Sequence, residues 1–183
     1  SSCPGFEGRV VYSAPWGALG LLAPVMAAEA QLILAAAAGQ VEEVQHLLRA
    51  GADANCQTLS GASPLYIAAR QGHARVVEAL LRLGARTATS MQDGSAPLFI
   101  AAWHGHLEVA QVLLHARARA DQATSSGAAP LFAAAMSGCE ALVEELLRHG
   151  VCVDQATYEG ATPLMAACAA GHAGVVRSLL RCS

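Results

Sequence analysis

The sequence predicts an all-α solenoid, in which helix-turn-helix units stack in one row and are joined by short β-hairpin-like fingers. A long stretch recurs every 33 residues, beginning at Gly61, Gly94, Gly127 and Gly160. Each copy has a proline three residues after that glycine and ends in a helical stripe of Val and Leu. A fixed period in this range is typical of an array in which each unit buries its apolar face only against its neighbours.

The unit that begins at Gly61 shows how the sequence specifies the two helices. Pro64 suits the first turn of a helix, where its missing N–H costs nothing, and Ser63 before it is a suitable N-cap. We expect the first helix over residues 64–71 and the second over residues 74–83. Gly84 then provides a left-handed C-terminal cap before an extended finger. The apolar stripe of the second helix consists of Val76, Val77, Leu80 and Leu81.

These motifs resemble the ankyrin repeat family. The resemblance rests on a Pro-Leu series, on the small pair that follows it and on a Gly-His pair before the second helix. The residues are Ser63-Pro64-Leu65, Ala96-Pro97-Leu98, Ala129-Pro130-Leu131 and Thr162-Pro163-Leu164; Ala68-Ala69, Ala101-Ala102, Ala134-Ala135 and Ala167-Cys168; and Gly72-His73, Gly105-His106 and Gly171-His172. The resemblance covers residues 28–183 as repeats of about 28–60 (degenerate), 61–93, 94–126, 127–159 and 160–183, after a leader over residues 1–27.

Several positions depart from the family pattern. Tyr66, Phe99, Phe132 and Met165 stand where the family's Thr-Pro-Leu-His motif has histidine, so we expect apolar packing to replace its polar contacts. Arg117 stands where Gly84 and Gly150 stand, which predicts a strained or differently shaped junction. Cys139 replaces the Gly-His histidine. Cys168 stands where the other small pairs have Ala, so we expect it to be a small buried side chain.

The two ends of the chain differ from the internal repeats. We expect the leader to be flexible or loosely packed, with a signal-peptide core or membrane anchor as the alternative because residues 10–28 carry no charge. The last unit repeats the internal apolar pattern with Val175, Val176, Leu179 and Leu180, which predicts an exposed apolar face. Either further repeats or another domain follow it, or this face self-associates; otherwise we expect a monomer.

Composition excludes several classes of function. The net charge is −3, without a long block of like charge, which argues against a binder of nucleic acid or anionic membranes. The six cysteines form no C-x-x-C pair and no tight Cys/His cluster, which favours a reduced compartment over disulfides or zinc. We therefore expect a cytoplasmic location, or a nuclear one, rather than secretion or membrane insertion.

The sequence contains no pattern of residues that indicates catalysis. It has no P-loop, no G-x-G-x-x-G after a strand, no G-x-S-x-G and no H-E-x-x-H. His104 and His106 suggest a metal pair, but His106 is the repeated Gly-His histidine, which we interpret as tightening the turn between the two helices. We expect no enzyme activity, no cofactor and no metal site.

What remains is the surface, which the resemblance implies is a concave face that binds a protein partner. Arg70, Trp103 and Met136 hold equivalent positions at the ends of first helices and should form one row, with Trp103 as the anchor. The alternative is that Trp103 packs on the neighbouring fingers and merely covers the core. The other candidate residues are His104, Gln71 and Ser137 at helix ends, and Leu59, Ser60, Gln92, Asp93, Ser125, Ser126, Tyr158 and Glu159 at finger tips.

Two further readings of function stay open from the sequence. The chain could be a structural spacer within a larger ankyrin-containing protein, or accompany an enzymatic or adaptor domain that lies outside it. The identity of a partner is not encoded in any motif, because the fold itself says nothing of specificity.

Overall fold

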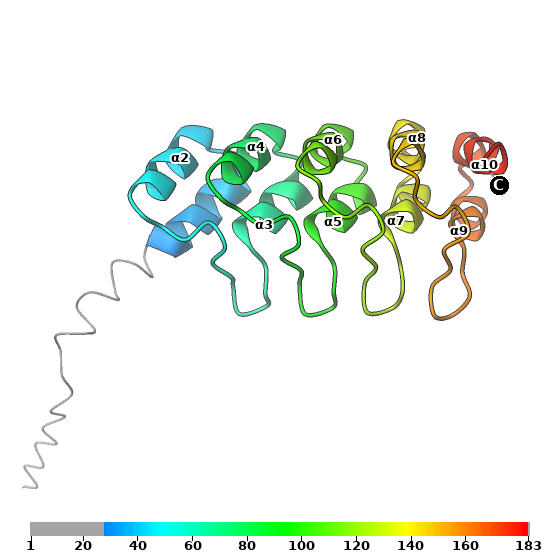
Figure 1. The fold of residues 1–183 in the computed structure, drawn as a ribbon, viewed down its shortest axis with the longest axis horizontal. Helices are drawn as coiled ribbons and strands as arrows, with labels where there is room; N and C mark the ends of the chain where they lie inside the picture. The colour runs from blue at the N-terminus through cyan, green and yellow to red at the C-terminus, as the bar shows by residue number, and fades with distance from the viewer. Residues whose placement is uncertain (1–27, 183) are drawn as a thin grey trace, which may run out of the picture.

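The computed structural model describes residues 28–182, which form a single row of helix pairs (Figure 1). The expected leader over residues 1–27 lies outside this part. Helix pairs follow one another at the predicted interval, with the fingers all projecting from the same side. The predicted all-α solenoid is confirmed: within residues 28–182 no β-strand forms, and the fingers are hairpin-like turns.

The first helix of each unit belongs to an inner layer, which lies next to the fingers (Figure 1). Pro64 begins its helix as predicted, and the Ser63 Oγ accepts a hydrogen bond from the N–H of Tyr66 (3.2 Å). The Oγ1 of Thr162 caps the last inner helix in the same way. The inner helices are residues 28–38, α3 (Pro64–Gln71), α5 (Pro97–Trp103), α7 (Pro130–Ser137) and α9 (Pro163–Ala170).

The second helix of each unit belongs to an outer layer, farther from the fingers (Figure 1). Its apolar stripe faces the inner layer: Val76, Val77 and Leu80 are fully buried. Leu113, the counterpart of Leu80 in the next unit, is fully buried as well. The polar residues Arg75, Glu78 and Arg82 lie outside that stripe and are exposed. The outer helices are α2 (Val41–Arg49), α4 (Ala74–Arg82), α6 (Leu107–His115), α8 (Glu140–Arg148) and α10 (Ala173–Leu180).

Each finger is closed by a tight turn before the next inner helix. In the first, the N–H of Thr58 donates to the carbonyl of Ala62 (3.0 Å), and the N–H of Gly61 donates to the carbonyl of Thr58 (2.9 Å). The Thr58 Oγ1 also accepts from the N–H of Ala62 (3.0 Å). Thr124 and Thr157 repeat this arrangement.

The small pairs on the inner helices form the contact between repeats. Ala68 and Ala69 are fully buried, as are their counterparts on α5 and α7. Side chains of this size let neighbouring helices approach closely, and α3, α5, α7 and α9 pack in sequence against one another. Cys168 contradicts our prediction, because it is exposed rather than buried. In residues 28–182 no unit covers the far side of α9, and that is the side on which Cys168 lies.

The absence of a further unit beside α9 in residues 28–182 also explains why Met165 differs from its counterparts in burial. Tyr66 is buried, and Phe99 and Phe132 are partly buried against the core, which confirms the expected apolar packing at three of the four positions. Met165 instead leaves 58% of its surface exposed on α9. On α10, Leu180 is exposed, but Val175 and Leu179 are buried and Val176 is partly buried, so the predicted exposed apolar face is present only at Leu180.

A histidine clamp links adjacent repeats. The Nε2 of His73 lies 3.0 Å from the carbonyl oxygen of Ala37 in the preceding unit, and His106 and His172 make the same contact with the carbonyls of Arg70 and Met136 (3.1 Å each). Because a carbonyl oxygen only accepts, each Nε2 carries the hydrogen. We interpreted these residues as tightening the turn within one unit; the structure shows that they join two units.

Each clamp also requires a glycine just after the inner helix of the preceding unit. A Cβ added at Gly72 would lie 2.9 Å from the ring of His106, and one added at Gly138 would lie 2.6 Å from the ring of His172. Real side chains essentially never approach so closely. The glycine therefore provides the space into which the next unit's imidazole fits.

The second helices end in left-handed turns. Gly84 has φ 96° and Gly150 has φ 74°, whereas the equivalent Arg117 has φ 60°. Arg117 therefore adopts the backbone conformation that we predicted from its position, at the steric cost that a Cβ brings to that region. Within the described residues it is the one non-glycine residue with positive φ.

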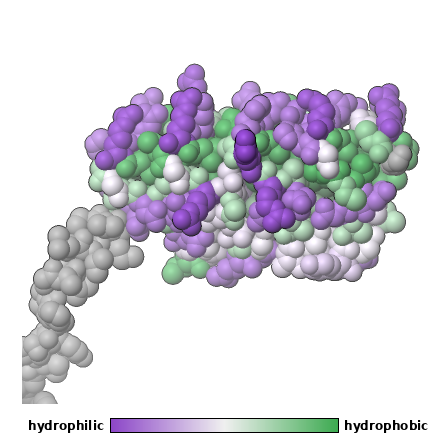
Figure 2. All heavy atoms as spheres, viewed as in Figure 1, coloured by the Kyte–Doolittle hydropathy of each residue, from purple (hydrophilic) through white to green (hydrophobic). Residues whose placement is uncertain are grey.

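Polar and apolar side chains separate along the array. Figure 2 shows hydrophilic side chains projecting beyond the outer helices and an apolar band running along the helical layer. None of the helices in residues 28–182 combines the length and hydropathy needed to cross a membrane.

Replacing Arg117 with glycine is expected to stabilise the array by about 1 kcal/mol, because it removes the Cβ from a left-handed position. The measurement is the midpoint of urea denaturation by circular dichroism. Gly150→Arg is the matched reverse change, since a Cβ there meets nothing within 4 Å; it should cost a similar amount. An Arg117→Gly protein no more stable than the parent would show that the turn carries no strain.

Enlarging a buried member of a small pair should destabilise the stack. Ala102→Leu is expected to cost about 1–3 kcal/mol, because α5 and α7 have no space between them for the added atoms. Cys168→Leu is the matched control at the equivalent, exposed position and should leave the denaturation midpoint nearly unchanged. Equal effects of the two changes would contradict the role of the small pairs.

Candidate functional site

The candidate site begins with a row of side chains at the ends of three inner helices. Arg70 lies at the end of α3, Trp103 ends α5 and Met136 lies at the end of α7. These helices are neighbours in the stack, so the structure brings the three residues together as equivalent positions of successive units. The carbonyls of Arg70 and Met136 are held by the clamps from His106 and His172. We call these three residues the helix-end row.

Trp103 is half-exposed at the centre of this row. Its side chain leaves 45% of its surface accessible and stacks on Phe99 of the same helix, with ring centroids 6.1 Å apart and an interplanar angle of 28°. Phe99 in turn packs against the core. The indole therefore has one face supported by a partly buried ring while much of it stays open to solvent. Offset aromatic pairs of this kind are favourable and restrict the rotation of the outer ring.

The apolar surface extends beyond the helix-end row. Phe132 lies one turn before Met136 on α7, and Phe99 has the same relation to Trp103 on α5. Met165 is the equivalent of Phe132 on α9 and is exposed. We define the inner strip as Phe99, Trp103, Phe132, Met136 and Met165. It brings aromatic and methionine side chains of three inner helices onto one surface.

Sequence reasoning did not assign Phe99, Phe132 and Met165 to this surface. They were interpreted as replacements of the family's motif histidine, with apolar packing in place of its polar contacts. Their position four residues before Trp103, Met136 and Ala169 was the available signal, because residues at that spacing share one face of a helix.

Three further predicted residues lie beside the helix-end row. His104 and Gln71 are exposed, and Ser137 is half-buried with its Oγ–H donating to the carbonyl of Ala134 (2.9 Å). The His104 ring lies 5.8 Å from that of His106. Burial lowers the pKa of His104 below its ordinary value, with smaller contributions from the neighbouring His106 and Arg70. His104 is therefore held in its neutral form more strongly than a free imidazole.

The finger tips form a second line of predicted residues. Two of them are large and open to solvent: Leu59 is 104% exposed and Tyr158 is 82% exposed. Leu59 accepts a hydrogen bond on its carbonyl from the Gln92 side chain (3.4 Å), and the N–H of Tyr158 donates to the carbonyl of Ser126 (3.0 Å). Adjacent fingers are thereby joined, which places their tips side by side.

Several polar finger residues already have partners within the fold. Asp93 Oδ1 accepts from both the N–H (2.9 Å) and the Oγ–H (2.5 Å) of Ser95. Hydrogen bonds from the Ser95 side chain, and then from its backbone, lower the pKa of Asp93. Ser60 and Ser126 share hydrogen bonds with the threonines that close their turns. The remaining finger residues Ser125 and Glu159 are exposed.

Two features of the described residues concern metal binding and cysteine reactivity. No group of three or more His, Cys, Asp or Glu side chains in residues 28–182 could hold a metal ion. Burial raises the pKa of the Cys56 thiol to about 11, with further contributions from Glu29 and Asp53. Such a thiol is not a nucleophile at neutral pH, because the reactive form is the thiolate.

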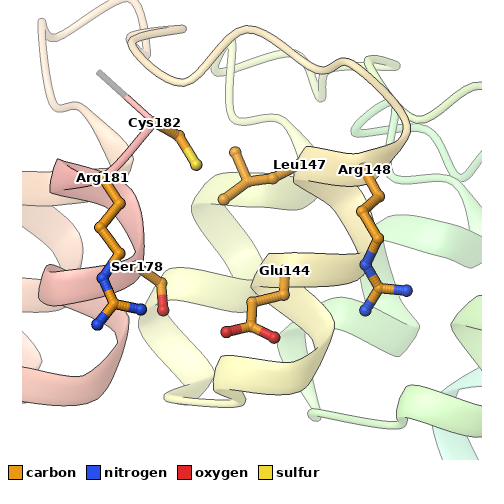
Figure 3. Close-up of a pocket in the computed structure, with 6 residues that line it drawn as sticks. All are labelled: Glu144, Leu147, Arg148, Ser178, Arg181 and Cys182. Carbon is orange, nitrogen blue, oxygen red and sulfur yellow. The ribbon is translucent and has the colours of Figure 1, made fainter.

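A groove between the outer helices is part of the stacking pattern. Figure 3 shows Glu144 and Leu147 of α8 across a hollow from Ser178 of α10 and from Arg181, which follows that helix. The volume of the hollow is about 340 Å³. A second groove, between α4 and α6, is lined by the same repeat positions two units earlier. A hollow that recurs with the repeat arises from the packing of outer helices, so it does not mark a particular ligand.

The geometry agrees with what comparison with known proteins finds. Residues 32–124 and 116–183 match the family model for ankyrin repeats in three copies, and together they span most of the chain. No curated protein matches this chain.

The pKa of His104 should depend on Arg70. In Arg70→Gln one of the three causes of the lowered pKa is removed, so the His104 pKa is expected to rise towards its ordinary value. The measurement is an NMR titration of the His104 imidazole, with Arg75→Gln on the outer helix α4 as a control that leaves the value unchanged. A His104 pKa that does not move in Arg70→Gln would show that the guanidinium is too well screened to act.

The lowered pKa of His104 also predicts how the free energy of unfolding depends on pH. Because the folded-state pKa of His104 lies below its unfolded value, the unfolded chain binds more protons between the two values. The contribution of His104 to stability is therefore complete above pH 6.5 and falls as the pH drops through that window. We expect His104→Gln to lose less stability than the parent between pH 7.5 and pH 5 in urea denaturation. The opposite order would contradict the lowered pKa.

Proposed function

Because the chain belongs to the ankyrin repeat family, whose repeats generally serve as protein–protein interaction modules, we propose that it binds a protein partner through the concave surface of the array. The proposed contact consists of the inner strip, with the helix-end residues and finger tips around it. The residues that we propose for this contact are Trp103, Arg70, Met136, His104, Gln71, Leu59, Gln92, Asp93, Ser125, Ser126, Ser137, Tyr158 and Glu159, together with Phe99, Phe132 and Met165.

One observation carries this proposal: a half-exposed tryptophan that is supported from behind and has a methionine beside it. Aromatic residues that are held rigidly lose little conformational entropy on binding, and Trp is among the residues that most often dominate interface energies. Methionine side chains adapt their shape to irregular surfaces. Trp103 and Met136 therefore combine a fixed anchor with an adaptable neighbour.

The charge distribution supports an apolar centre with a polar rim. None of the five inner-strip residues is charged, whereas Arg70 lies at one end of the helix-end row and Asp93 and Glu159 lie on the fingers. Interfaces commonly have this arrangement, in which charged groups at the rim guide orientation while desolvation of the centre provides affinity. We accordingly propose a partner that presents apolar side chains to Trp103 and a carboxylate to Arg70.

Binding rather than catalysis is the function that these features support. Ankyrin repeats are typically non-enzymatic. The polar side chains nearest the inner strip, His104 and Ser137, are not arranged as nucleophile and base: the Ser137 hydroxyl is bonded to a backbone carbonyl. We propose that they contribute to recognition at the rim.

Trp103→Glu is expected to weaken partner binding by about 30-fold or more, because hot-spot residues contribute about 2 kcal/mol or more. The measurement is capture from a cell lysate with the parent and the variant chains, quantified by mass spectrometry. Circular dichroism should show an unchanged fold, since Trp103 is half-exposed. A protein retained by the parent and lost by the variant identifies the partner.

Two controls accompany this measurement. Arg75→Glu places a negative charge on the exposed face of the outer helix α4 and should retain the partner. Leu113→Glu buries a charge in the core and should unfold the array locally. Equal capture by the parent and Trp103→Glu would contradict the concave-surface proposal and favour a spacer role.

A further inference from the structure

One of the four junctions between repeats lacks the histidine clamp. Cys139 occupies the position of His73, His106 and His172, so residues 94–126 and 127–159 are not joined in this way. The carbonyl that a histidine here would reach is that of Trp103, which stands 36 residues earlier like the other three acceptors. Gly105 still provides the space: a Cβ added there would meet the Cys139 Cβ at 3.6 Å and the Ser137 side chain at 3.7 Å, which are ordinary contacts.

The other junctions also have further hydrogen bonds between repeats. Asn55 bonds to both the carbonyl of Gly84 (3.1 Å) and the N–H of Arg86 (2.8 Å), which joins the first two units. The Ser178 Oγ–H donates to Glu140 Oε1 (3.1 Å) and joins the last two. Between residues 94–126 and 127–159 of the described chain, the hydrogen bonds beyond the finger turn at Thr124 are limited to one between backbones, from the N–H of Tyr158 to the carbonyl of Ser126 at the finger tips.

Packing at this junction differs between the two layers. The inner helices α5 and α7 make the most extensive contact of any helix pair described, whereas the outer helices α6 and α8 make the least extensive contact among neighbouring outer helices. The junction is therefore tight beside the inner strip and loose on the opposite side. The strained Arg117 turn follows α6 directly and lies on the loose side.

From these observations we infer that the junction between residues 94–126 and 127–159 is a hinge of the array. The outer helices α6 and α8 separate there, while α5 and α7 stay in contact through their alanines. Residues 28–126 and 127–182 then move as two blocks, and the curvature of the inner face changes between Trp103 and Met136. This inference concerns the fold alone and holds whether or not the inner strip binds a partner.

The loss of one clamp is expected to weaken this junction by the contribution of one hydrogen bond. A hydrogen bond contributes about 1 kcal/mol net to stability, which corresponds to a factor of about five in an opening equilibrium. In a linear array, such a difference at one junction decides where the row separates first, because each repeat interacts only with its neighbours. The missing clamp therefore favours separation of the outer helices at Cys139 over the junctions that have a clamp.

Native-state hydrogen exchange of the full chain in low urea, read by mass spectrometry, tests this inference. Hinge motion by itself leaves the helical hydrogen bonds intact, but it leaves residues 127–182 with only the α5–α7 contact to the rest of the array, so this block unfolds more readily than residues 28–126. In the parent, peptides from α7 to α10 should therefore lose protection together, before those from α3 to α6. Cys139→His supplies an imidazole opposite Gly105 and should raise the protection of the α7–α10 block about fivefold. Cys139→Ala is the matched control, which restores no clamp and should leave the boundary where it is.

A second variant tests the same cause without requiring a new histidine to fit. His106→Cys copies the Cys139 junction to the boundary between residues 61–93 and 94–126. It should create a new exchange boundary between α4 and α6, with protection beyond it lowered about fivefold.

The results of these measurements distinguish the alternatives. A boundary between α6 and α8 in the parent, moved by Cys139→His or reproduced by His106→Cys, supports the hinge. Exchange of the whole array as one unit, or fraying of residues 160–182 alone, overturns it. A boundary at the right place that neither variant affects also overturns it, because the missing clamp would then not be its cause.

Discussion

Close approach of neighbouring inner helices is the constraint on which the rest of this structure depends. It requires alanines where the inner helices touch. It also requires a glycine at the end of the inner helix, which leaves space for the histidine ring of the next unit. Where both are present, the Nε2–H of one unit reaches the backbone carbonyl of the previous one, and the stack is fixed by packing and by a hydrogen bond together. Each unit packs only against its neighbours, so this contact determines the spacing and curvature of the whole array.

The same constraint generates the candidate surface. Alanines occupy the contact between inner helices, and the side chains of Arg70, Trp103 and His104 at the helix ends are exposed. A clamp holds the backbone of Arg70 and of Met136, and the finger tips are joined by their own hydrogen bonds. Within each block of clamped repeats, the backbone thus supports surface side chains that can vary without disturbing the fold. We propose that specificity lies in those side chains, above all in Trp103, which stacks on Phe99.

Much of the fold was predictable because the same helix-start, capping and turn residues recur in several repeats. The Pro64 helix start, the Ser63 cap and the left-handed Arg117 were read correctly from local sequence. Cys168 was not, because burial at that position depends on a following unit rather than on the residue itself. The clamp was missed for a related reason: His73 and Ala37 lie 36 residues apart, and no local pattern shows that they meet. The inner strip required the relation between helices, which the sequence alone does not provide.

The account's central claim is that the inner strip is a contact surface for another protein. Site-specific photo-crosslinking tests it most directly, with p-benzoylphenylalanine in place of Phe132 on the inner strip and, separately, in place of Arg75 on the outer helix α4. The ring at position 132 preserves the apolar character of the strip, so binding is retained. The account predicts a discrete protein adduct from position 132 and none from position 75. An adduct from position 75 alone, or none from either, would contradict it.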